Sequence, residues 1–77
     1  MHIARFSNSY QLILQKGSDG AWDGMVNGPC PVRDQRISIS DLEEAKHSLY
    51  GLADTHFSLK GIVELRIPEH QMRWDSR

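Results

Sequence analysis

Two stretches of the chain alternate between hydrophobic and polar residues, which is typical of strands that bury one face. They are residues 10–15, Y-Q-L-I-L-Q, and residues 21–26, and the turn sequence G-S-D-G at 17–20 separates them. Glycine supplies the positive φ that tight hairpin turns require, so we expect an antiparallel hairpin here. Tyr10, Leu12 and Leu14 would share one face of the first strand, and Trp22 and Val26 would face one side of the returning strand.

A loop and a third strand are expected after the hairpin. The segment 27–31 contains two prolines, which have no amide proton for a sheet ladder, so it predicts a loop or a bulged edge. Extended structure resumes at 36–39, where isoleucines alternate with other residues. The N-terminal residues 3–6 form a short and mixed stretch, and we assign no strand to them.

The clearest local signal is a capping box at Ser40–Glu43, in which the serine oxygen accepts a hydrogen bond from the amide three residues on. After it the hydrophobic spacing becomes that of an amphipathic helix. The apolar face of this helix consists of Leu42, Ala45, Leu49, Leu52 and Ala53. Gly51 either ends the helix near Tyr50 or weakens it before Asp54, and residues 55–61 are expected to form a connector.

The last alternating stretch, I-V-E-L-R-I at 62–67, predicts a final strand. Its inward residues would be Val63, Leu65 and Ile67. Residues 69–77 are polar except for Met72 and Trp74, and they predict a tail or a short terminal helix. We therefore expect a single α+β domain over 1–68 and a C-terminal tail over 69–77. Its architecture would be βββαβ, a small two-layer domain with an antiparallel sheet and one helix packed on one face.

Composition and charge narrow the class of protein. The 77 residues include 9 Lys+Arg and 10 Asp+Glu, for a formal charge of −1, and the basic residues are scattered. Nucleic-acid binding normally needs a basic stripe, so direct binding to nucleic acid is not expected. The longest apolar run is Leu12–Leu14, far short of the roughly 20 residues that cross a bilayer, and no signal-peptide core follows Met1. We expect a cytoplasmic protein without membrane association.

The single cysteine, Cys30, excludes an intrachain disulfide and a cysteine-based zinc site within one chain. One small core gives a chain of this size little net stability, so we expect a homodimer or a partner-bound state. A small enzyme with Cys30 as its nucleophile is one hypothesis, since this residue lies in a Gly-Pro-Cys-Pro loop. The four histidines lack the spacing of helical metal ligands. We predict no catalytic residue, metal or cofactor.

The leading hypothesis is a non-enzymatic module that binds another protein. Aromatic residues and methionine are enriched at protein interfaces, and a single helix covers only one face of a sheet. The predicted contact residues are Tyr10, Ile13, Trp22, Met72 and Trp74. A hypothesis of another class is a phage or mobile-element protein that blocks a nucleic-acid-processing machine of its host. In that case the acidic residues Asp41, Glu43 and Glu44 would mimic phosphates, and salt would weaken the complex strongly.

Four features, in this order along the chain, match a known family pattern: Tyr10 in the first strand, D-G-A-W at 19–22, G-P-C-P at 28–31 and S-D-L-E-E-A at 40–45. The order resembles the N-terminal domain of the small antitoxin family called HicB, over residues 10–54. Ala21 stands in place of the second glycine of the family's turn, and no helix-turn-helix or ribbon-helix-helix segment follows Ile67. The resemblance implies a solitary toxin-masking, antitoxin-like inhibitor domain of βββαβ type, with no catalytic residues, and not a repressor.

Overall fold

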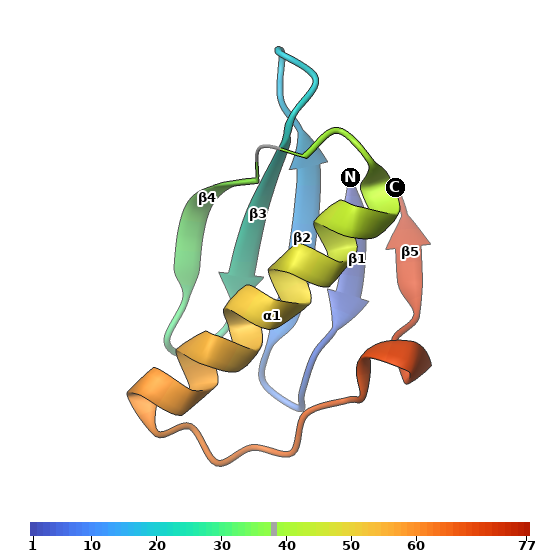
Figure 1. Cartoon of the computed structure of the whole chain (residues 1–77). Helices are drawn as coiled ribbons and strands as arrows, with labels where there is room; N and C mark the ends of the chain where they lie inside the picture. Colours follow the sequence, from blue (N-terminus) through green and yellow to red (C-terminus); the bar gives the residue numbers. More distant parts are fainter. Residues whose placement is uncertain (38) are drawn as a thin grey trace.

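One helix lies across one face of an antiparallel sheet (Figure 1). The computed structural model describes residues 1–37 and 39–77. Within them the strands are β1 (His2–Arg5), β2 (Gln11–Lys16), β3 (Trp22–Asn27), β4 (Val32–Ile37) and β5 (Trp74–Ser76), and the helices are α1 (Leu42–Lys60) and the short 3-10 helix η1 (Glu69–Gln71). The sheet order is β4-β3-β2-β1-β5, with antiparallel pairing throughout. The predicted two-layer α+β class is confirmed.

The strands β1 to β4 form a meander whose central hairpin agrees with the sequence pattern. Gly20 adopts a φ of 87° in the turn between β2 and β3, as a tight turn requires. Leu12 and Leu14 are fully buried while Gln11 and Gln15 are exposed, so the alternation along β2 does separate two faces. The prolines stay in the loop before β4, outside the ladder.

Two strand assignments need correction. Residues 2–5 form β1, which pairs with β2 through Ile3 and Ile13, although this stretch lacks a recognisable pattern. The third strand of the prediction, at 36–39, lies earlier in the structure, since β4 spans Val32–Ile37 and has a register shift against β3. That prediction includes Ser38, which lies outside the described residues.

The start of α1 is shifted by one residue from the predicted capping box. Asp41 is the N-cap, and its Oδ2 accepts a hydrogen bond from the amide of Glu44 at 3.0 Å. The backbone carbonyl of Ser40 instead accepts a hydrogen bond from the indole Nε1 of Trp22 at 3.1 Å. Both S-D-L-E at 40–43 and D-L-E-E at 41–44 fit a capping box, so the local sequence does not decide whether Ser40 or Asp41 is the N-cap. The hydrogen bond from Trp22 to Ser40 distinguishes the two residues in the folded chain.

The helix continues well past Gly51, so the predicted end near this residue and the connector at 55–61 are wrong. Its buried residues recur every four positions, at Ala45, Leu49, Ala53 and Phe57. The last of them anchors the final turns against the sheet. Gly61 ends the helix with a φ of 65°, a left-handed conformation that glycine adopts without strain.

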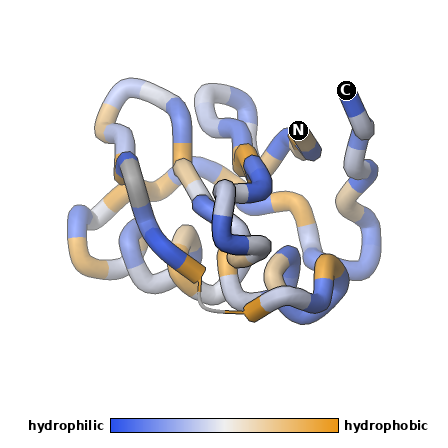
Figure 2. Tube along the Cα trace, turned by 90° about the horizontal axis from the view of Figure 1, so that it is seen from above, coloured by the Kyte–Doolittle hydropathy of each residue, from blue (hydrophilic) through white to orange (hydrophobic). Residues whose placement is uncertain are grey.

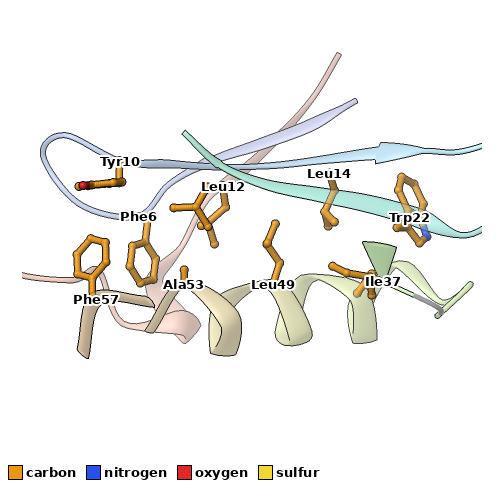
Figure 3. Packing of buried hydrophobic residues seen from close by; sticks show 11 residues of the cluster. Phe6, Tyr10, Leu12, Leu14, Trp22, Ile37, Leu49, Ala53 and Phe57 are labelled. Atoms are coloured by element: carbon orange, nitrogen blue, oxygen red, sulfur yellow. The ribbon is translucent and has the colours of Figure 1, made fainter. Parts of the chain in front are cut away.

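The core lies between α1 and the sheet, where side chains of both layers interdigitate (Figure 3). At one end Phe57 packs edge-on against two aromatic rings, with centroid distances of 5.0 Å to Phe6 and 4.9 Å to Tyr10. At the other end Leu49 packs near Ile37 and Leu14. Edge-to-face pairs of this kind add to the stabilisation from apolar burial.

The C-terminal part of the chain differs most from expectation. Residues 62–67 form no strand, so the predicted strand there is wrong. The final strand is β5, which lies within the expected tail and pairs with β1 through Ala4–Trp74 and His2–Ser76. The two chain ends consequently lie side by side (Figure 1 and Figure 2), and Arg77 donates its amide to the carbonyl of Met1 at 2.7 Å. The tail therefore completes one edge of the sheet.

Candidate interaction surface

The connector 61–68 presents apolar side chains to solvent and turns polar ones inward. Val63 and Leu65 are 97% and 92% exposed, which is unusual for residues in an extended, β-like sequence. Glu64 and Arg66 alternate with them and are half-buried. The predicted alternation thus exists over residues 63–66, but with the opposite face toward the core, whereas Ile67 is half-buried as its predicted inward position implies.

Glu64 holds the connector to the β1–β2 loop. Its Oε1 accepts hydrogen bonds from the hydroxyl of Ser7 at 3.0 Å and from the amide of Ser9 at 2.9 Å. Desolvation of the carboxylate works against its charge, but these hydrogen bonds outweigh it and lower the pKa of Glu64 below its ordinary value. The charged carboxylate is therefore the form that fits this loop.

Contacts on the other side of Leu65 hold the connector to α1. Arg66 forms an ion pair with Asp54 at 2.5 Å, and its guanidinium lies 5.2 Å from the ring centroid of Phe57. Tyr50 donates its hydroxyl to the carbonyl of Ile67 at 2.9 Å. Burial, together with the nearby carboxylates of Asp54 and Glu69, raises the pKa of Tyr50 although Arg66 opposes the shift. The neutral phenol and the ion pair fix the backbone that presents Leu65.

Leu59, in the last turn of α1, is also largely exposed, at 80%. We call Leu59, Val63 and Leu65 the exposed trio. They follow one another along the chain at the point where α1 ends and the connector begins. Each of the three side chains presents a large aliphatic surface to solvent, and exposed aliphatic surface is a common feature of protein-binding sites.

One member of the trio, Leu59, also lines a groove between β4 and α1. This β4–α1 groove has a volume of about 350 Å³. Its lining consists of Val32, Gln35, Gly51, Leu52, Thr55, His56 and Leu59. Among the side chains that the structure describes, this lining contains no carboxylate and is largely apolar. β4 itself is the last strand in the sheet order, so its outer edge has no neighbouring strand among the described residues.

The sheet face opposite the helix presents a narrower apolar surface. Ile3, Ile13 and Met25 stand side by side across β1, β2 and β3, and each is half-buried. Polar residues flank this row on both sides, with Gln11 and Gln15 along β2. A strip of three side chains is small beside the roughly 800 Å² that each partner contributes to a standard interface. Ile13, predicted as a contact residue, lies at its centre.

Two of the predicted contact residues lie in the core instead of on the surface. Tyr10 is 3% exposed, and its hydroxyl accepts a hydrogen bond from the amide of Cys30 at 3.0 Å. Trp22 is 7% exposed and contacts the residues that lead into α1. The premise that a single helix leaves these rings uncovered is wrong, because Phe57 of α1 packs against Tyr10 and the segment that leads into α1 contacts Trp22.

Met72 and Trp74 are half-buried and pack against the core from the C-terminal segment. Trp74 lies in β5, and the ammonium of Lys46 lies 5.5 Å from the centroid of its ring. The nearby η1 is tied to α1 by a 2.7 Å contact between His47 Nδ1 and Glu69 Oε2. Both apolar side chains therefore help to dock β5 onto the rest of the molecule.

The acidic residues at the start of α1 have local structural roles. Asp41 caps the helix, and Glu43 forms an ion pair with Lys46 at 3.4 Å. Glu43 and Glu44 lie in the first turn, where a negative charge interacts favourably with the helix dipole. These contacts account for Asp41, Glu43 and Glu44 without phosphate mimicry.

Cys30 is half-buried in the loop before β4, and both its amide and its carbonyl group are in hydrogen-bond contact with side chains. His56 Nε2 lies 2.8 Å from the carbonyl oxygen of Cys30, so the imidazole contacts the backbone and not the sulfur.

Among the described residues, no three His, Cys, Asp or Glu side chains come together as metal ligands. Within the same residues, no helix is long and apolar enough to span a membrane.

Comparison with protein-family models, curated proteins and solved structures found no match to this chain. The candidate surface therefore rests on geometry alone. Sequence reasoning missed the exposed trio and the β4–α1 groove. The alternation in 62–67 does identify Val63 and Leu65 as one face, but alternation cannot tell which face is buried.

Proposed function

We propose that this chain is a non-enzymatic module that binds another protein through the exposed trio, the β4–α1 groove and the β4 edge. The observation that carries the proposal is the outward orientation of Val63 and Leu65 on a backbone that Glu64 and Arg66 hold in place. Burying an exposed valine or leucine is worth about 1.5–3 kcal/mol, so the trio could supply about 5–9 kcal/mol before the cost of association. That range suits a partner-binding hot spot.

A more specific form of the proposal is an antitoxin-like inhibitor in the cytoplasm. It is supported by the resemblance of residues 10–54 to the N-terminal domain of HicB antitoxins. Such a module would act by covering a surface of its partner, and it needs no catalytic group of its own. A homodimer through the same surface is the competing arrangement, and a mass measurement separates the two.

The test is the native mass of the protein isolated from its own cells, for the natural chain and for the double variant Val63→Ser/Leu65→Ser. We expect a complex with a second protein that the double variant no longer forms. Both side chains are almost fully exposed, so the free energy of unfolding of the variant should lie within about 0.5 kcal/mol of that of the natural chain. The matched control is Gln11→Ser/Gln15→Ser, which changes two exposed residues of β2 on the open sheet face.

The outcomes separate clearly. A complex that survives the Val63→Ser/Leu65→Ser change would remove the trio from the interface. Loss of the complex in the Gln11→Ser/Gln15→Ser control would move the contact to the open sheet face around Ile13. A mass equal to one or two copies of this chain alone would overturn the proposal of a second protein.

A further inference from the structure

We infer that the partner contributes an extended, acidic segment that adds to β4 as a new edge strand and places alternate side chains in the β4–α1 groove. This inference rests on the proposed function and names the chemistry of the partner. β4 lies at the outer edge of the sheet, and α1 passes beside it on one face (Figure 1).

The free edge supplies the main-chain contacts. β4 has six residues, and β3 is its one neighbour in the sheet order of the described residues. One side of its backbone is therefore open to pairing, and an added strand would lie about 4.8 Å farther out. Strand addition of this kind derives affinity from main-chain hydrogen bonds and specificity from pockets for alternate side chains.

The groove supplies the pocket. It lies between β4 and α1, on the core side of the strand, and Leu52 and Leu59 are its large apolar residues. Gly51 also lines it, and no atom lies within 4 Å of the position a Cβ would take there, so the groove is open at this point. Side chains on one face of an added strand recur about every 6.8 Å, so two of them would enter a groove of about 350 Å³.

Charge complementarity selects an acidic segment. The β4 sequence V-R-D-Q-R-I contains two arginines and one aspartate, a net charge of +1, and no carboxylate belongs to the part of the groove lining that the structure describes. Arg33 and Arg36 are both exposed, and Arg36 forms an ion pair with Asp19. Opposite charges on neighbouring strands are stabilising and like charges are destabilising. An acidic strand therefore fits beside Arg33, and a basic one is repelled.

The same charges disfavour a second copy of this chain as the occupant. If β4 paired with itself over its full length in antiparallel register, Val32 would lie opposite Ile37 of the other copy. Arg33 would then lie directly opposite Arg36 of the other copy, which places like charges across the new ladder. Charged residues on edge strands protect many sheets from self-association in this way.

The experiment uses the full chain and a six-residue probe, Glu-Leu-Glu-Val-Glu-Leu-amide with fluorescein on its N-terminus, with binding followed by fluorescence anisotropy and by amide shifts of β4 in NMR spectra. We expect the shifts to concentrate on β4 and the facing side of α1. Arg33→Glu should weaken binding about five- to ten-fold, since a favourable cross-strand pair becomes a repulsive one. The matched control is Arg73→Glu, an exposed arginine just before β5 at the opposite edge of the sheet, which should leave the affinity unchanged.

Two altered probes complete the design. A version with N-methyl groups on alternate amides cannot donate to β4 and should lose binding, and a version with lysine in place of glutamate should bind Arg33→Glu better than the natural chain. Equal binding of the N-methylated probe would exclude strand addition, and equal weakening by Arg33→Glu and Arg73→Glu would exclude charge recognition at β4. Either result overturns this inference alone, because the proposed function depends separately on the native complex and on Val63 and Leu65.

Discussion

Replacing Gly51 by alanine should raise the free energy of unfolding by about 1 kcal/mol, the difference between glycine and alanine inside a helix. Gly51 lies in the middle of the 19-residue α1 and is exposed. A Cβ added to it would meet no atom within 4 Å, so neither a clash nor new burial modifies the propensity difference. For a domain of this size, about 1 kcal/mol corresponds to a rise in Tm of about 4–8 °C.

Gly61 provides a matched control because the same atom is added ten positions later. No atom lies within 4 Å of its Cβ position either, but its φ is +65°, where an L-residue costs roughly 1–2 kcal/mol. Gly61→Ala should therefore lower the stability that Gly51→Ala raises. Urea unfolding followed by circular dichroism measures both variants. If Gly51→Ala is destabilising, or if the two variants behave alike, the helix does not continue through Gly51 to a left-handed cap at Gly61.

Two further predictions concern the core and the connector. Phe57→Ala removes the ring between Phe6 and Tyr10 and should lower the unfolding free energy by about 3–5 kcal/mol in urea melts; a loss under about 1 kcal/mol would contradict this packing. Glu64→Gln should make the free energy of unfolding depend less on pH in the acid range. Because the folded-state pKa of Glu64 is lowered, its contribution is present above the pKa of an ordinary glutamate, about 4.3, and is lost as the pH falls through the folded-state value. Melts between pH 7 and pH 3 test this, and parallel profiles for both proteins would refute it.

The sequence predicts those parts of this fold that are determined by residues close together along the chain. The alternation in β2, the glycine turn and the prolines before β4 all act locally, and the structure agrees with them. The end of α1 could not be inferred in the same way, since glycine at position 51 weakens a helix only by about 1 kcal/mol. Burial of Phe57 against Phe6 and Tyr10 offsets that cost, and those partners are distant in sequence.

The first and last strands of the chain escaped prediction for the same reason. β1 and β5 are four and three residues long, and neither has room for a pattern of its own. They form because each pairs with the other and β1 also pairs with β2. Met72 and Trp74 mark the C-terminal segment as one that needs an apolar contact, and that contact proves to be the chain's own core.

The orientation of the connector calls for an explanation outside the chain itself. Val63 and Leu65 contribute almost no burial, so serine at both positions would serve the fold equally well. The contacts that hold the connector come from Glu64, Arg66 and Ile67, none of which needs an aliphatic neighbour. Single exposed aliphatic residues are common on protein surfaces, but here Val63 and Leu65 are exposed at alternate positions of a backbone that Glu64 and Arg66 hold in place. The proposed partner would bury these side chains and so account for what the fold alone does not require.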